Sequence, residues 1–136
     1  MANHFPNWQL DHEREHRLQA VKVAGELEAL QAEAPGHVIV VGDLDADPDA
    51  DSIRFWTGRY VIDNTSVCYC SAWDPTHPEQ PLATFTPDNP DAVDWDWPFR
   101  GIDHAFIRRG THSGPTLPIR ACHRIFDQPA TRVGDH

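Results

Sequence analysis

The chain has 136 residues, with 11 basic and 21 acidic side chains and a formal net charge of −10 at pH 7. This length suits one domain with a core of its own, and 40% hydrophobic with 24% charged residues is a globular rather than a disordered composition. The negative charge argues against broad electrostatic binding to nucleic acid, which needs a cationic surface, but it is compatible with a cation-dependent site. No apolar run reaches the ~20 residues of a membrane-spanning helix.

Cysteine usage indicates a reducing compartment. Cys68, Cys70 and Cys122 are too few and too irregularly spaced for a disulfide framework or an all-cysteine zinc site. The first residues carry no pattern of a charged stretch followed by an apolar one, as a signal peptide would. We therefore expect reduced thiols in a cytoplasmic protein.

The first half of the chain predicts a helix, a buried strand and a short second helix. Apolar residues recur three and four positions apart over residues 11–30, and an Ala-Pro-Gly tripeptide ends this helix. Residues 37–41 form a β-branched run without alternation, which is typical of a strand buried on both faces. An acidic run over residues 42–51 follows, and then a short amphipathic helix over residues 51–57 that ends at a glycine.

The second half predicts further strands around a long excursion. Residues 65–73 alternate as a strand does, and residues 101–108 form another strand. Between them lies a Pro/Asp/Trp-rich excursion over residues 74–99, with a strand at 83–86, and a last strand is predicted at 121–126. The order of elements predicts an α/β fold, in which a mixed and mainly antiparallel sheet carries helices on one face.

Two carboxylates, Asp43 and Asp45, follow the strand at residues 37–41. Like charges this close together repel, and a hard divalent cation with oxygen ligands would neutralise them. The crevice at the carboxyl ends of strands is also where open α/β sheets bind ligands. We interpret Asp43, which follows a glycine that permits a tight turn, as functional. The later aspartates of the run are interpreted as a solvated turn that caps the next helix: Asp47, Asp49 and Asp51.

The Asp-x-Asp-x-Asp spacing of this run also begins a calcium-binding EF-hand loop. That loop needs glycine at its sixth position and glutamate at its twelfth. The three registers put Pro48, Ala50 or Ser52 at the sixth position, and none has glutamate at the twelfth. The run is therefore not an EF-hand.

Asp103 stands in the middle of a predicted strand, where a carboxylate is unusual. An inward-facing Asp103 needs a partner, and holding a histidine in one tautomer is an obvious use. His104 projects from the other face, so we interpret it as a surface or hydrogen-bonded residue instead.

A second histidine pattern lies on the first helix. His12 and His16 match the His-Glu-x-x-His pattern of zinc proteases. A zinc site would need a third protein ligand and a cleft around it, so we interpret both as helix-surface histidines.

Taken in order, the motifs resemble the endonuclease/exonuclease/phosphatase superfamily, which includes deoxyribonucleases, apurinic endonucleases, sphingomyelinases and inositol phosphatases. The family has a Thr-His-Leu-like strand end, an Arg-x-x-Gln helix, a strand running into Gly-Asp-Phe-Asn, an Arg-Ile-Asp-Tyr strand and a final Ser-Asp-His. The corresponding segments here are Asn3-His4-Phe5, Arg14-Glu15-His16-Arg17-Leu18-Gln19, Gly42-Asp43-Leu44-Asp45, Gly101-Ile102-Asp103-His104 and Gly134-Asp135-His136.

The resemblance implies half of the family's four-layer α/β sandwich. Residues 1–136 would be one partial domain, with the upstream half and its metal-binding glutamate missing. Three positions depart from the family pattern: Asp45 stands in place of asparagine, His104 in place of tyrosine and Gly134 in place of serine.

The activity that the resemblance implies is Mg²⁺- or Mn²⁺-dependent phosphoester hydrolysis. It implies that the carboxylate of Asp103 lies within hydrogen-bonding reach of a His136 ring nitrogen, with Asp43 close by and His104 on the opposite face. The resemblance also implies a role for each site residue. Asp43 positions or deprotonates the attacking water and binds the metal, and Asp135 supports the metal. Asp45 stands where the phosphate-orienting group belongs, Asp103 orients His136, His136 contacts the phosphate, and His4 aids the leaving group.

The implied substrate is a phosphate ester in nucleic acid, in a phospholipid or in a small molecule. The net charge of −10 favours the last two. The alternative is a non-catalytic α/β module that has lost the metal site, which the absent glutamate and Asp45 favour. A half-sheet also exposes an edge that invites self-association.

Overall fold

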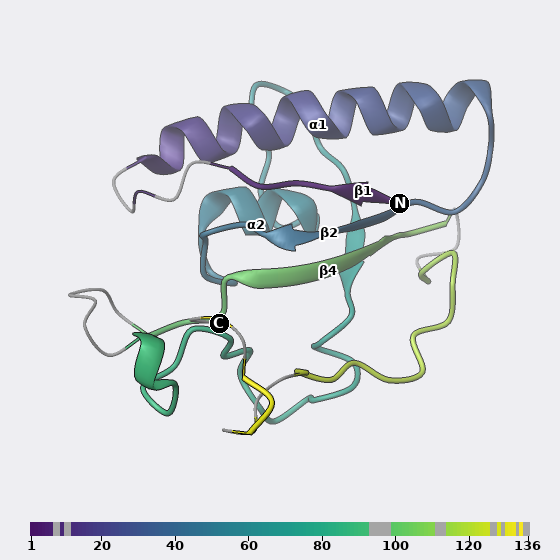
Figure 1. Cartoon of the computed structure of the whole chain (residues 1–136). Helices are drawn as coiled ribbons and strands as arrows, with labels where there is room; N and C mark the ends of the chain where they lie inside the picture. The colour runs from purple at the N-terminus through teal and green to yellow at the C-terminus, as the bar shows by residue number, and fades with distance from the viewer. Residues whose placement is uncertain are drawn as a thin grey trace.

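The computed structural model describes residues 1–6, 9, 12–92, 99–110, 114–125, 128, 130–132 and 134. The elements in chain order are β1 (Ala2–Asn3), α1 (Glu13–Glu33), β2 (Ile39–Asp43), α2 (Asp51–Trp56), β3 (Tyr69–Ser71), the 3₁₀ turn η2 (Pro90–Ala92) and β4 (Asp103–Arg108). The strands form one sheet in the order β1-β2-β4-β3 (Figure 1). β1 is parallel to β2, whereas β4 is antiparallel to both of its neighbours. The predicted α/β class, with a mixed and mainly antiparallel sheet, is confirmed.

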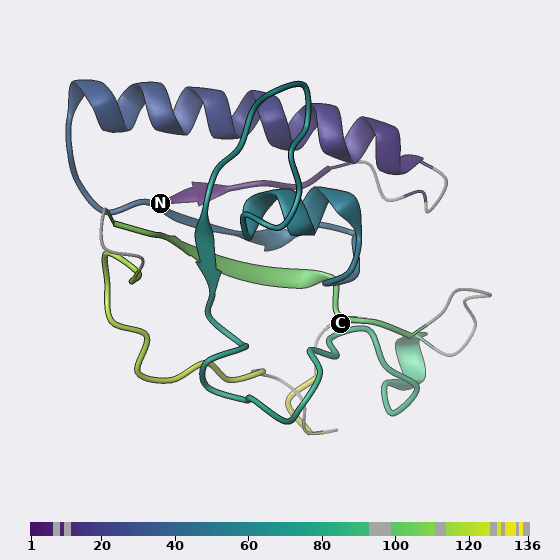
Figure 2. The same cartoon turned by 180° about the vertical axis from the view of Figure 1, so that it is seen from behind.

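Both helices share one core with the sheet. α1 runs beside β1, and α2 lies in front of the strands in the view from behind (Figure 2). The ring of Trp56 meets Tyr69 edge-on and stacks on Phe106. Small residues bring α1 close to this core, because Ala20 and Ala24 are its buried apolar positions. Leu18 and Leu30, which the predicted stripe includes, are exposed.

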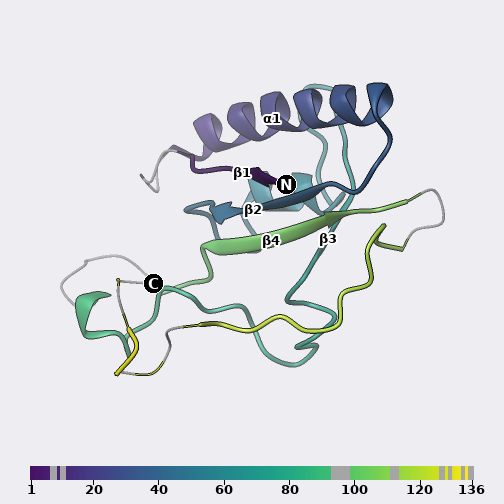
Figure 3. The same ribbon diagram turned by 45° about the vertical axis from the view of Figure 1, so that its right-hand side comes forward.

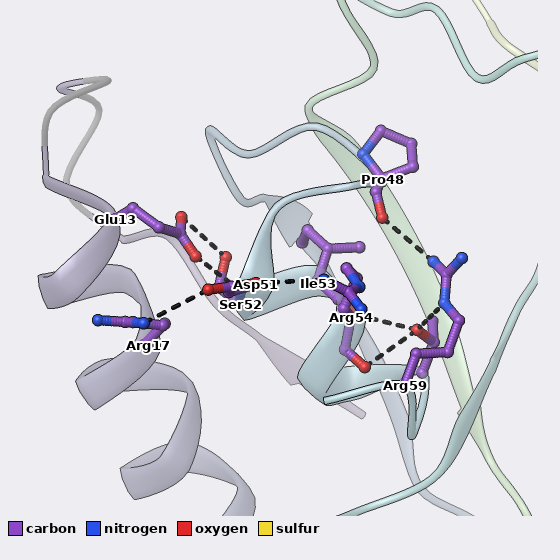
Figure 4. A network of polar contacts seen from close by, with 9 residues as sticks. Glu13, Arg17, Pro48, Asp51, Ser52, Ile53, Arg54 and Arg59 are labelled. Carbon is purple, nitrogen blue, oxygen red and sulfur yellow. Dashed lines mark hydrogen bonds and ion pairs between the residues drawn. The ribbon is translucent and has the colours of Figure 1, made fainter. Parts of the chain in front are cut away.

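The start of α2 is held by α1 rather than by its own acidic run (Figure 4). Its N-cap residue, Ala50, has no capping side chain. Glu13 of α1 instead accepts hydrogen bonds from the backbone N–H and the hydroxyl of Ser52, at 2.7 and 3.2 Å. Asp51, predicted to be part of a solvated cap, contacts Arg17 and Arg54 at 3.4 Å each. A charged side chain from another helix thus satisfies N–H groups that a helix start leaves open.

Several predicted element bounds differ from the observed ones. The first helix is shifted to Glu13–Glu33, and the start of its predicted range, Asp11, lies outside the described residues. The buried strand ends at Asp43, two residues later than predicted. The predicted strand at 65–73 is reduced to Tyr69–Ser71. Because a strand needs a neighbour to pair with, its length depends on the partner as well as on the sequence.

Two predicted strands are wrong over the described residues. The segment 83–86 forms only an isolated bridge between Phe85 and Arg100, and residues 121–125 form no strand. The interpretation of His16 as a surface residue is also wrong. Its side chain is 3% exposed, and its Nδ1 lies 3.3 Å from Oε2 of Glu13.

Within the described part of the chain, no helix is long and apolar enough to cross a membrane. All three cysteines are free.

Candidate active site

Asp43 and Asp103 face each other across the β2–β4 ladder. They are register partners at the end of β2 and the start of β4. Residues directly opposite on antiparallel strands project from the same face of the sheet, and both carboxylates line one cavity of about 430 Å³. The two aspartates that the sequence analysis selected from distant segments are therefore brought to one place.

The cavity lies between the sheet and the segments that cross its other face. Trp73 and Leu82 contribute from the chain after β3, and His123 and Arg124 from the chain after β4. The chain after β4 runs on the side of that strand away from α1 (Figure 3). Segments predicted as strands or loops thus form a wall opposite Asp43 and Asp103.

Thr84 anchors the backbone that carries Asp103. Its buried hydroxyl accepts hydrogen bonds from the backbone N–H groups of Ile102 and Asp103, at 3.0 and 3.2 Å. Gly101 permits this close approach, because a Cβ there would lie 2.6 Å from the backbone oxygen of Leu82. Sequence reasoning did not select Thr84, since nothing local to it indicates contact with a segment 18 residues away.

The glycine before Asp43 has a different role from the predicted one. Gly42 belongs to β2 and does not make a turn. A Cβ on Gly42 would clash with the carbonyl oxygen of His4, so this glycine lets the chain after β1 lie against β2.

The turn after β2 is tight and acidic. Asp45 adopts a left-handed backbone conformation, with φ of 48°, and is 7% exposed. Its N–H donates to Oδ1 of Asp43 at 3.0 Å, a local contact that aspartate makes readily in turns. Asp45 therefore supports the backbone next to Asp43, and it does not line the cavity that Asp43 and Asp103 share.

Arg100 is a cation at this turn that sequence reasoning missed. Its Nη1 donates to the carbonyl oxygen of Asp45 at 3.0 Å. Burial lowers the pKa of Arg100, whereas the nearby carboxylates of Asp45, Asp47 and Asp43 raise it. The guanidinium thus offsets part of the negative charge that the acidic run brings together.

His104 lies on the helix side of the sheet, as its strand position predicts. Its ring stacks on Phe106, with centroids 5.3 Å apart, and burial lowers its pKa. A carbonyl can only accept, so the ring donates its Nε2–H to the Ala46 oxygen at 2.8 Å. His104 is therefore a buried, hydrogen-bonded residue and not the partner of Asp103.

His4 follows β1 directly and continues its pairing with β2. Its backbone N–H donates to the Val41 carbonyl at 3.0 Å, which continues the β1–β2 pairing by one residue. Burial and the charge of His16 on α1 lower the pKa of His4. His4 is not among the described residues that line the cavity.

Asp135 and His136 lie outside the described residues, so their predicted roles and the contact between Asp103 and His136 stay predictions. The residue before them, Gly134, accepts a hydrogen bond from the side chain of Asn89 at 2.8 Å. Asn89 lines the same cavity as Asp103. The last described residue is therefore tied to the wall of the cavity.

The carboxylate oxygens of Asp43 and Asp103 are the type of ligand that Mg²⁺ and Mn²⁺ prefer. Among the described residues, no group of three or more His, Cys, Asp and Glu side chains is placed to hold a metal ion. These residues thus supply only part of a ligand set.

Comparisons with known proteins agree with this fold. The chain is similar in fold to the catalytic domain of human Nocturnin with a bound sulfate anion, with a TM-score of 0.54 and 17% sequence identity. The match covers 76% of this chain and 33% of that one, so this chain spans about a third of the Nocturnin domain. A search of curated sequences finds no significant match. The sequence matches the Endonuclease/Exonuclease/phosphatase family over residues 2–136, and the chain belongs to that family.

Proposed function

We propose that this chain carries the carboxylate part of the active site of a Mg²⁺- or Mn²⁺-dependent phosphoester hydrolase. The observation that supports this most directly is the pair Asp43 and Asp103, which are register partners and line one cavity. Two like charges placed opposite each other disfavour the fold unless a cation or a proton donor is shared between them. Membership of the family points to phosphoester chemistry as the use of that arrangement.

Each residue has a role in the proposed hydrolysis that follows from its position. A bound Mg²⁺ or Mn²⁺ would neutralise charge that develops on the phosphoryl oxygens. Asp43, at the end of a buried strand, would hold the metal together with Asp135 and would accept a hydrogen bond or a proton from the attacking water. Asp103, whose backbone is fixed by Thr84, orients His136 toward the phosphate. The part that the resemblance implies for His4, to aid the leaving group, stays a prediction, because His4 is not among the described residues that line the cavity.

The cavity wall opposite the aspartates favours an anionic substrate. Arg124 and Arg132 both line the cavity, and both approach the carboxylate of Asp88, at 3.6 and 3.5 Å. Both guanidinium groups are thus cations on the described part of this wall, where an anionic phosphate could bind. The substrate in this proposal is a phosphate ester of nucleic acid, phospholipid or a small molecule, and the net charge of −10 favours the last two.

The test is hydrolysis of bis(p-nitrophenyl) phosphate by the product of the complete reading frame. We expect turnover with Mg²⁺ or Mn²⁺, loss of turnover in EDTA, and a kcat/KM lower by about 10²–10⁴ in Asp43→Asn. Asp63→Asn is the matched control: Asp63 is exposed and has a positive φ that asparagine tolerates, so its activity should equal that of the wild type. Full activity in EDTA, or an active Asp43→Asn protein, contradicts the proposal.

A second candidate is a non-catalytic module that associates with itself. β1 lies at the edge of the sheet, and the neighbouring Phe5 is 67% exposed. An unpaired strand edge next to an exposed aromatic residue is a template for pairing with another chain. Sedimentation of the same protein separates the two: a stable dimer that hydrolyses no phosphate ester under any metal condition favours the module.

A further inference from the structure

Two side chains of the segment that carries Asp103, those of Arg100 and His104, bind consecutive carbonyl groups of the turn after β2. Arg100 Nη1 donates to the Asp45 oxygen at 3.0 Å, and His104 Nε2 donates to the Ala46 oxygen at 2.8 Å. Segment 100–104 also contributes the Ile102 carbonyl, which accepts from Leu44 N–H at 2.7 Å. Three hydrogen bonds from one short segment thus hold the turn at three successive residues.

Both side chains start from fixed positions. The backbone of Arg100 exchanges two hydrogen bonds with Phe85, each of 2.9 Å. His104 belongs to β4 and stacks on Phe106, a residue of the main core. The Arg100 backbone and the His104 ring are therefore held by contacts outside the turn, which suits both residues to support it.

The turn needs such support because its own conformation is unfavourable. Asp45 has a positive φ, a conformation that non-glycine residues adopt infrequently. The acidic run also brings the carboxylates of Asp43, Asp45 and Asp47 together around Arg100, which attracts all three. Without a cation and without the two carbonyl contacts, repulsion and backbone strain would both favour other conformations of the turn.

We propose that Arg100 and His104 are positioning residues that fix the turn after β2 and thereby hold the carboxylate of Asp43 at the cavity. Oδ1 of Asp43 is tied to this turn through the N–H of Asp45, so a displaced turn moves or releases the carboxylate. We call the two side-chain contacts of Arg100 and His104 with the turn the clamp. The catalytic consequence of the clamp rests on the proposed function, whereas its effect on the turn does not.

Residue-resolved hydrogen exchange of the whole protein tests the clamp without reference to activity. Arg100→Gln removes the charge, and His104→Phe keeps the ring stack but removes the donor. We expect the amides of residues 44–47 to exchange about tenfold faster in each variant, with α1 unchanged, because each variant loses a side-chain hydrogen bond to the turn. Arg100→Lys, which keeps a charged donor, should restore most of the protection. Unchanged exchange in both variants, or an equal rise in α1, overturns the proposal.

Arg59→Gln is the matched control for these variants. Arg59 also donates to a backbone carbonyl of the same loop, Pro48, at 3.1 Å, but it is exposed and lies beyond the turn (Figure 4). Its loss should leave the exchange of residues 44–47 as in the wild type. Faster exchange there in Arg59→Gln would show that any loop contact has this effect, and would overturn the specific role of Arg100.

Steady-state kinetics test the positioning role. In an active protein, Arg100→Gln and His104→Phe should lower kcat about tenfold with KM unchanged, because substrate contacts on the opposite wall remain. In an Asp43→Asn background the same changes should have no further effect. Unchanged kcat together with faster exchange overturns the positioning role. If no phosphate ester is hydrolysed by the wild type, the proposed function fails, and hydrogen exchange still decides whether the clamp exists.

Discussion

Glu28 links α1 to the strands β3 and β4, and its removal is expected to destabilise the fold measurably. Its carboxylate accepts from Nε of Arg108 at 2.8 and 3.0 Å and from the hydroxyl of Tyr69 at 3.0 Å. Tyr69 is fully buried in the main core. In Glu28→Ala the hydroxyl of Tyr69, a residue that is 1% exposed, loses this acceptor.

The magnitude follows from the exposure of each partner. An orphaned buried hydroxyl costs about 1–2 kcal/mol. The side chains of Arg108 and Glu28 are 27% and 33% exposed, so solvent screening limits their ion pair to at most ~1 kcal/mol. We expect Glu28→Ala to lower the free energy of unfolding by about 2 kcal/mol, and Tyr69→Phe by about 1 kcal/mol.

Urea denaturation followed by tryptophan fluorescence measures both changes. In the double variant, the effect of Tyr69→Phe should nearly vanish, because its partner is already gone. Equal effects of Tyr69→Phe with and without Glu28 would refute the reasoning, since they would show that the hydrogen bond does not couple the two residues.

The same contact predicts a dependence on pH. The hydrogen bonds from Arg108 hold the pKa of Glu28 below its usual value of 4.5. A carboxyl whose pKa is depressed by folding stabilises the fold above its unfolded pKa, and this contribution is lost as the pH falls through the folded pKa. The stability difference between the wild type and Glu28→Gln should therefore be full at pH 7 and should decline once the pH falls below about 4.5. A constant difference down to pH 3 would contradict this.

Two further predictions concern stability. Glu13→Ala removes the acceptor at the start of α2 and should lower the free energy of unfolding by about 1–2 kcal/mol in urea denaturation, whereas Glu15→Ala on the exposed side of the same turn should change it little. Gly101→Ala should destabilise the fold strongly, because the new Cβ would meet the backbone of Leu82. Gly25→Ala, which has open space in α1, should instead stabilise the fold by about 0.5–1 kcal/mol. Thermal unfolding of the two variants distinguishes these opposite effects.

The types and order of the main elements could be predicted from the sequence because their signals are local. Apolar spacing over residues 11–30 predicts the first helix, and the β-branched run at 37–41 predicts the central strand. The Gly-Asp sequence after this run identified Asp43, because a carboxylate at the end of a buried strand is costly without a use. Family resemblance followed from the order of the motifs, which needs no knowledge of contacts.

Contacts between distant segments were decided by the tertiary structure alone. A strand pattern at 83–86 cannot show whether a neighbour is available, and only a single bridge to Arg100 forms. The burial of His16 depends on how α1 packs, which its own periodicity does not specify.

The site, too, combines residues that local sequence predicts with contacts that only the tertiary structure decides. Asp43 and Asp103 could each be selected from local sequence, but their direct opposition depends on the register of β2 against β4, and a slip of one residue would turn one of them to the other face. Arg100 and His104 carry no local signal of their contacts with the turn after β2, because those contacts join residues 55 and 58 positions apart. The sequence thus determines which carboxylates are present, and the packing of the sheet determines that they share one cavity and what holds them there.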